Sequence, residues 1–313
     1  MRTVKALPIM HKPSKVVSAF LLACLLTLPQ IAAQNATPAP AKKALFWKAS
    51  SANNVVYLLG SIHLGSKSMY PLPHEIEDAF EKSTALVVEV DINHVDKEKL
   101  QALILETGLY PDDDLLWNHV SKETRANLEE FCSTYGVPAQ LFAKMKPWMV
   151  SVAAGEIAMA KMGMDPELGI DKYFLDKAGK TKDQKRVVEI ESAEWQIKLL
   201  SGFADDVQGT LLASAMEDMA KLPEKMKQVR EAWLSGDADT VDKLLSESSR
   251  VPEHVKKAML ADRNLHMADV ADQFLKGKEQ VFVVVGAAHF VGKDGVVAIL
   301  KNRGYKLEQV SLK

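Results

Sequence analysis

Two histidines of this chain follow the same short pattern at places far apart in the sequence. Gly60-Ser61-Ile62-His63 comes directly after the apolar run 55–59, and Gly286-Ala287-Ala288-His289 comes directly after the apolar run 281–285. Each pattern is typical of a buried strand that ends at a glycine and presents an imidazole just beyond it. Because ligands of open α/β sheets bind beyond the carboxyl ends of the strands, we expect both histidines to face one shared site.

Imidazole is a common neutral metal ligand and a general base near neutral pH. A single G-x-x-H pattern says little, but two such patterns, each after a fully apolar strand, favour a functional site because polar groups are rare at such positions. The alternative is that His63 and His289 only cap strand ends with satisfied hydrogen bonds.

A carboxylate ends the third apolar run of the chain. Glu89 follows residues 85–88, and its burial is unfavourable unless it meets a cation, a metal or several hydrogen-bond donors. Two histidines and one carboxylate form a metal-ligand set that leaves positions open for water and substrate, and manganese, cobalt, zinc and iron all suit it. We therefore expect His63, Glu89 and His289 to hold a divalent metal. A salt bridge at the sheet edge is the alternative for Glu89.

Arg263 and Asn264 are the third candidate element. They lie three and four residues after Leu260 on a helix whose apolar face continues at Met267, so at least one side chain is expected to point inward. An inward guanidinium could bind a substrate carbonyl or a developing oxyanion. We therefore predict catalytic roles for Glu89, Arg263 and Asn264, with a structural arginine–carboxylate bridge as the alternative for Arg263.

The elements that must position these residues indicate an α/β fold of the mixed α+β kind. Patterns typical of strands occur near both ends of the chain, whereas residues 96–276 are mostly helical in pattern. We expect a central mixed β-sheet built from the N- and C-terminal parts, with a large helical insertion between them and one domain over residues 44–313. The expected strands cover residues 45–47, 55–59, 85–88, 186–190, 281–285 and 306–310, and a helix is expected over residues 294–302.

The first 33 residues have the layout of a secretory signal peptide. Basic residues precede the apolar stretch 16–28, which is short for a membrane span, and small residues follow it. Residues 34–43 are expected to form a flexible leader, and no later segment is apolar enough to span a bilayer. The chain is therefore predicted to be exported, to the periplasm or the medium. A lipid anchor on Cys24 is a minor alternative.

Charge and cysteine content exclude several classes of protein. The formal net charge is −2 and there is no basic block, which argues against nucleic acid as a partner. Removal of the signal peptide leaves Cys132 as the one cysteine, so no internal disulfide can form. The sequence contains no phosphate-binding glycine loop, no G-x-S-x-G elbow and no H-E-x-x-H helix.

Together, the two G-x-x-H motifs and Glu89 resemble the hallmarks of the TraB/GumN family. That family is related to the Tiki proteins and, more distantly, to erythromycin-esterase-like and ChaN-like proteins. The resemblance covers about residues 45–312. Its further matches are Lys146-Pro147-Trp148, Leu168-Gly169-Ile170-Asp171, the segment 191–196, Trp233-Leu234-Ser235-Gly236-Asp237 and Arg263-Asn264.

The resemblance implies more about the site than about the reaction, because one fold hosts several activities. Tiki-like members are metal-dependent peptidases, so it implies an exported metal-dependent hydrolase, most simply a peptidase acting on a peptide or protein. ChaN-like relatives imply the alternative, a non-catalytic envelope protein that binds metal, haem or peptide.

Overall fold

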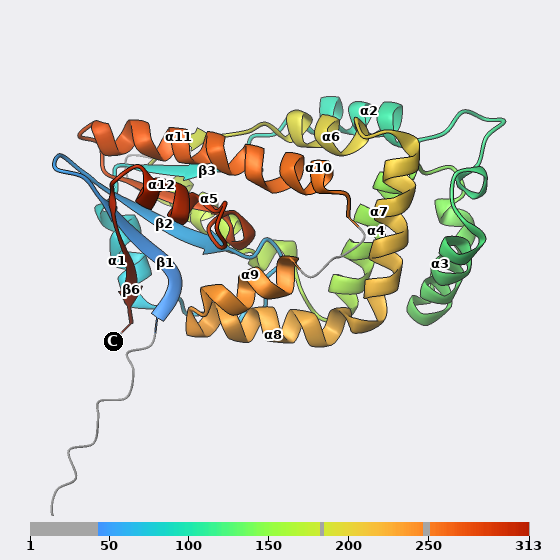
Figure 1. Cartoon of the computed structure of the whole chain (residues 1–313), viewed down its shortest axis with the longest axis horizontal. Coiled ribbons are helices and arrows are strands. Elements are labelled where there is room, and N and C mark those ends of the chain that lie inside the picture. Colours follow the sequence, from blue (N-terminus) through green and yellow to red (C-terminus); the bar gives the residue numbers. More distant parts are fainter. Residues whose placement is uncertain (1–42, 182–184, 247–250, 313) are drawn as a thin grey trace, which may run out of the picture. The chain divides into compact units, whose positions relative to one another are not determined.

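Strands from both ends of the chain form one six-stranded sheet, shown in Figure 1. The computed structural model describes residues 43–181, 185–246 and 251–312. The predicted signal peptide 1–33 and all of the predicted leader except Lys43 lie outside these residues. The strands are β1 (Lys43–Ser50), β2 (Val55–Ser61), β3 (Ala85–Val88), β4 (Arg186–Glu189), β5 (Val281–Gly286) and β6 (Lys306–Ser311).

The order of strands across the sheet is β4-β3-β5-β2-β1-β6. Neighbours from β4 to β2 are parallel, whereas β1 is antiparallel to both β2 and β6. Every residue of β3 and β5 is buried, as expected for central parallel strands covered on both faces. The predicted mixed sheet with its helical insertion is therefore confirmed.

Helices account for most of the chain between β3 and β5. The α-helices are α1 (His74–Lys82), α2 (Lys97–Gly108), α3 (Lys122–Tyr135), α4 (Pro147–Lys161), α5 (Ile170–Lys180), α6 (Ala193–Ser201), α7 (Asp205–Asp218), α8 (Leu222–Ser235), α9 (Ala238–Ser246), α10 (Glu253–Lys256), α11 (Asp262–Lys276) and α12 (Val296–Asn302). A five-residue π-helix, η6 (Lys257–Ala261), joins α10 to α11. Short 3-10 helices include η4 (Pro166–Leu168) and η7 (Ala287–His289).

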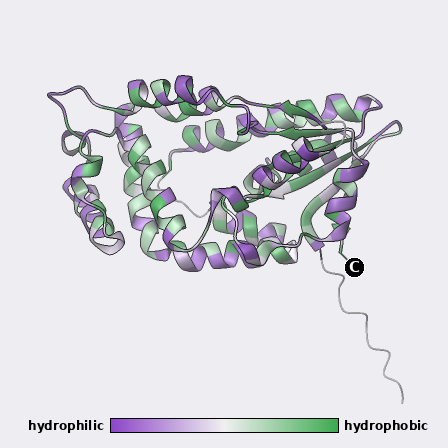
Figure 2. Ribbon diagram, turned by 180° about the vertical axis from the view of Figure 1, so that it is seen from behind, coloured by the Kyte–Doolittle hydropathy of each residue, from purple (hydrophilic) through white to green (hydrophobic). Residues whose placement is uncertain are grey.

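Two separate hydrophobic cores stabilise these elements. The larger core surrounds the sheet, whose strands are mostly hydrophobic in Figure 2, and the rings of Phe80, Phe174 and Phe282 pack together there from α1, α5 and β5. The smaller core lies among α3, α4 and α7 and contains Cys132, which is buried as the apolar helical pattern around it predicts. The insertion therefore has a hydrophobic centre of its own and also supplies helices to the sheet.

Within the described part of the chain, no helix has both the length and the apolar character needed to cross a membrane.

Candidate functional site

The two G-x-x-H motifs meet because their strands are parallel neighbours. In the register of β2 and β5, Ser61 lies opposite Gly286. Gly60 lacks the side chain that would obstruct this meeting, since a Cβ there would lie 3.1 Å from Cα of Ala287 in the second motif. The Nε1 atom of buried Trp233 donates to the Gly60 carbonyl over 2.6 Å and fixes the end of β2. His63 and His289, which are far apart in the sequence, therefore lie at the same edge of the sheet.

Glu89 reaches the same edge from the end of β3. Its Oε1 accepts a 2.6 Å hydrogen bond from the backbone N–H of Gly286 and lies 3.8 Å from Nε2 of His289. A Cβ on Gly286 would lie 3.2 Å from both Glu89 Oε1 and His63 Nε2. The structure therefore gathers the three predicted metal ligands around Gly286, which has no side chain of its own.

His63 is held through its other ring nitrogen. Its Nδ1 lies 2.8 Å from Oδ2 of Asp171, and Ser61 Oγ donates to Oδ1 of the same carboxylate over 2.8 Å. The negative charge of Asp171 raises the pKa of His63 to about 9. This contact orients the ring and leaves Nε2 directed toward Glu89 and Gly286.

Close backbone packing places Asp171 for this role. The N–H of Ile170, at the start of α5, donates to the Ile62 carbonyl over 3.1 Å. The preceding residue must be a glycine, because a Cβ on Gly169 would lie 2.2 Å from the His63 carbonyl oxygen. The first turn of α5 therefore lies directly against the first motif.

His289 is buried and has a different partner. Its Nδ1 lies 2.6 Å from Oδ1 of Asn264, whose Nδ2 donates to the Asp294 carbonyl over 2.8 Å. Because the amide nitrogen of Asn264 is committed to Asp294, its oxygen faces the ring and Nδ1 of His289 must carry the proton. Burial lowers the pKa of His289 to about 4, so the ring is neutral and the Nε2 lone pair is free.

Arg263 joins two buried carboxylates. Its Nη2 donates to Glu89 Oε2 and Glu191 Oε2, each over 2.8 Å, and its Nε donates to Glu191 Oε1 over 2.8 Å. Its Nη1 donates to the Met259 carbonyl in η6, which fits the frequent occurrence of π-helical turns at functional sites. The ion pairs that the sequence left open as alternatives for Glu89 and Arg263 are therefore present. One N–H of Nη1 has no acceptor among the described residues.

Glu89 is ionised despite its burial. Burial opposes ionisation, but the charge of His63, the Gly286 N–H and Arg263 together hold its pKa below the usual value. Its second oxygen also accepts from Gln196 Nε2 over 3.2 Å, and the same amide donates to Glu191 Oε2 over 2.9 Å.

The donor chemistry of this cluster fits a divalent metal. Glu89 Oε1 and His63 Nε2 each lie 3.2 Å, and His289 Cδ2 3.6 Å, from the position that a Cβ on Gly286 would take. The Nδ1 atom of each imidazole is held by an oxygen acceptor, as is usual for metal-binding histidines. Within the described ranges, no three His, Cys, Asp or Glu side chains already stand in an arrangement that could hold a metal ion. Metal binding therefore remains a prediction that the donor set supports.

A cleft of about 700 Å³ opens over the cluster. His63, Glu89 and Asp171 line it at the sheet edge, and Glu156 and Ala160 line it from α4. His63 is the exposed member of the cluster, with a side chain 60% accessible, whereas His289 and Glu89 lie beneath. A ligand entering this cleft would thus meet His63 first.

The structure brings together all five residues proposed from the sequence, and their catalytic and metal-binding roles remain predictions. Arg263 and Asn264 both point inward, where they hold Glu89 and His289 respectively. Four residues that complete the cluster have no role predicted from the sequence: Ser61, Asp171, Glu191 and Gln196. All four lie in segments quoted for the family resemblance, and that was the one signal available for them.

Comparison with known proteins gives one family. Residues 45–309 match the model of the TraB/PrgY/gumN family. The chain is 27% identical over 249 residues to the uncharacterized protein YbaP of Escherichia coli (strain K12), which covers 80% of this chain and 89% of YbaP. It is 24% identical over 284 residues to an uncharacterized protein of Treponema pallidum (strain Nichols), which covers 84% of this chain and 81% of that protein. No solved structure matches significantly.

Proposed function

The chain belongs to the TraB/PrgY/gumN family, and from this premise and the site geometry we propose that it is an exported, metal-dependent hydrolase of peptide bonds. The observation that carries the proposal is the convergence of His63 Nε2, His289 and Glu89 Oε1 around Gly286. Two imidazoles and one carboxylate match the ligand sets of catalytic metals, which keep a position open for water. The predicted signal peptide over residues 1–33 supports export.

His63, His289 and Glu89 would hold the metal. A divalent ion held by these residues would supply a water molecule of lowered pKa and a Lewis acid for the scissile carbonyl. Manganese, cobalt, zinc and iron are all compatible with these ligands.

The other residues of the site prepare this arrangement. Asp171 and Asn264 fix the orientation of the two imidazole rings. The Nε2 lone pair of His289 is available, whereas metal binding would have to displace the Nε2 proton that the raised pKa of His63 retains at neutral pH. Arg263 holds Glu89 through Nη2, and its remaining Nη1 hydrogen can donate to a substrate carbonyl or oxyanion. Asn264 thus supports catalysis through His289, and Arg263 supports it both through Glu89 and by direct donation.

The test is cleavage of a mixed peptide library by the mature protein, read by mass spectrometry with added manganese, cobalt or zinc. The wild type is compared with a His63→Ala/His289→Ala variant and with a His74→Ala/His254→Ala control, which removes two histidines outside the cluster. We expect metal-stimulated cleavage by the wild type and the control, and at least about a hundredfold less by the cluster variant.

Two results would count against the proposal. Cleavage that survives in the cluster variant would place the activity elsewhere. Metal binding without cleavage of any library peptide would leave the alternative of a non-catalytic envelope protein. Export is tested separately by N-terminal sequencing of the protein from the cell envelope fraction, where we expect a start near residue 34.

A further inference from the structure

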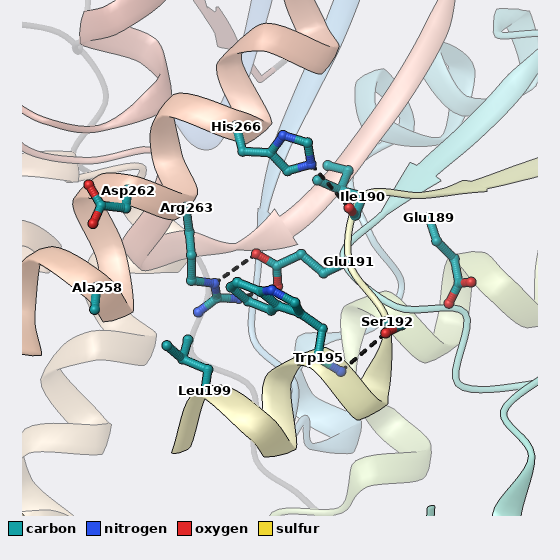
Figure 3. A pocket seen from close by; sticks show the side chains of 10 residues that line it. All are labelled: Glu189, Ile190, Glu191, Ser192, Trp195, Leu199, Ala258, Asp262, Arg263 and His266. Carbon is teal, nitrogen blue, oxygen red and sulfur yellow. Dashed lines mark hydrogen bonds and ion pairs between the residues drawn. The ribbon is translucent and has the colours of Figure 1, made fainter. Parts of the chain in front are cut away.

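A second cavity borders Arg263 and Glu191, and neither His63 nor His289 lines it. It has a volume of about 670 Å³, and Figure 3 shows its lining side chains converging from the end of β4, α6 and the η6–α11 segment. Ile190, Trp195, Leu199 and Ala258 form its apolar part. None of these four residues belongs to the metal-ligand cluster.

This cavity shares a wall with the cleft over His63. Arg263 and Glu191 line the cavity, and Arg263 Nη2 binds Glu89, which lines the cleft. Gln196 lines the cleft and donates to both Glu89 and Glu191. A chain bound over Gln196 would therefore place one residue in the cavity and a nearby bond beside His63.

The cavity is suited to an apolar group. Trp195 remains 43% exposed although it lines a concave surface, and Leu199 lies beside it one helical turn later in α6. Large aromatic side chains left accessible in concave sites are typical of ligand-binding pockets. In Figure 3 the indole of Trp195 projects toward Arg263.

Charge argues against an anionic occupant. Glu189, Glu191 and Asp262 line the cavity, whereas Arg263 is its one lysine or arginine. That guanidinium is already paired with two buried carboxylates, Glu89 and Glu191. A negatively charged ligand would therefore meet an excess of negative charge.

We propose that this cavity is the specificity pocket of the hydrolase and that it takes a large, uncharged apolar side chain of a peptide substrate. This inference rests on the proposed function, and it makes Trp195, Leu199 and Ala258 the residues that determine substrate preference. The substrate class is then a neutral or basic peptide with an aromatic or large aliphatic residue close to the cleaved bond.

The test uses matched peptides that differ at one position, which carries Phe, Leu, Gly or Asp. We expect the wild type to cleave the Phe or Leu peptide at least about tenfold faster than the Gly peptide, with the Asp peptide slowest, since burial of a large apolar group discriminates by such factors. Ala258→Trp fills the pocket and should remove the preference for Phe, and Leu199→Ala should weaken it. Leu265→Ala is the matched control, because Leu265 is 50% exposed on α11 and lies outside the cavity lining.

A binding measurement separates failure of this inference from failure of the hydrolase proposal. Saturation-transfer NMR with N-acetyl-phenylalaninamide should show contact with the wild type and with Leu265→Ala, and none with a folded Ala258→Trp variant. Such binding without cleavage of any peptide would support the pocket and overturn the hydrolase. Cleavage with no side-chain preference, or binding and cleavage unchanged by Ala258→Trp, would overturn the pocket and leave the hydrolase standing.

Discussion

His63 and Asp171 are separated by 108 positions in the sequence and joined by a 2.8 Å contact between Nδ1 and Oδ2. The contact connects the end of β2 to the first turn of α5, so the orientation of the imidazole depends on a helix of the insertion. Ser61, inside the same G-x-x-H motif, donates to the second oxygen of Asp171 and fixes the carboxylate in turn. The motif therefore supplies both the histidine and a residue that holds the histidine's partner.

Replacement of this partner tests its positioning role. Asp171→Asn removes the charge beside His63 with little change of shape, and we expect about 10- to 100-fold weaker metal affinity, the usual cost of losing such a contact. Isothermal titration of chelator-treated protein with manganese or zinc measures it. Asp176→Asn is the control, because Asp176 lies on the same helix but binds Lys172 and Asn93. Equal metal affinities of Asp171→Asn and Asp176→Asn would show that Asp171 does not position His63 for metal binding.

Gly286 gives a second, purely steric test. A methyl group there would lie 3.2 Å from Glu89 Oε1 and from His63 Nε2, so Gly286→Ala must displace both. The shift required is a few tenths of an ångström. We therefore expect about a tenfold loss of peptide hydrolysis, because a misplacement of about 1 Å can cost about a hundredfold.

The control for this change is another glycine-to-alanine variant. A Cβ on Gly155, inside α4, has no atom within 4 Å. Gly155→Ala should therefore keep full activity and raise the free energy of unfolding by up to about 1 kcal/mol. Equal activity in both variants would show that the space beside Gly286 is not needed.

Arg263 is expected to matter for stability as well as for activity. Arg263→Met leaves the buried Glu89 and Glu191 carboxylates without their common cation, and breaking such a buried pair costs about 3–5 kcal/mol. Adding Glu191→Gln should restore part of this loss. Urea denaturation measures both effects, with Arg303→Ala as the control, since its partner Asp269 is exposed and such pairs contribute about 1 kcal/mol or less.

The sequence predicts the sheet and the convergence of the two motifs more completely than the rest of the site. Apolar runs such as residues 281–285 form strands because both faces are buried, and the glycine at each strand end marks where the backbones approach. Asp171 and Glu191 carry no comparable local signal, since an acidic residue near the start of a helix is also typical of an exposed helix terminus. The partner of Asp171 is His63 and the partner of Glu191 is Arg263, and both are far away in the sequence. Only tertiary packing brings these pairs together.

Helix boundaries show the same dependence on tertiary structure. The pattern predicts a helix over residues 294–302, but α12 begins at Val296 because Gly295 is extended and caps it. The Asp294 carbonyl remains outside the helix and accepts from Asn264, the residue that orients His289. The two-residue difference is therefore part of how the site is built.

A pH prediction concerns the loop that joins α2 to α3. His119 bonds to Asp114 and Asp205, and although burial opposes protonation, these contacts raise its pKa above the usual value. The resulting stabilisation is fully present below about pH 6.5, the pKa in the unfolded chain, and is lost as pH rises through the raised pKa of the folded state. The wild type should therefore be more stable than His119→Gln at pH 6, and this difference in the free energy of unfolding should become smaller at pH 9. Urea denaturation of both proteins at the two pH values measures it, and a difference that does not shrink would contradict the prediction.

If His63, His289 and Glu89 form one metal site, the metal content of the protein must depend on the two histidines. Elemental mass spectrometry is applied to the mature wild type and to the His63→Ala/His289→Ala variant after incubation with manganese, zinc or cobalt and removal of free ion, with folding checked by circular dichroism. We predict close to one ion per chain in the wild type and none in the folded variant. If the wild type bound none of these ions, or if both proteins contained equal amounts of metal, His63, His289 and Glu89 would not form a metal site.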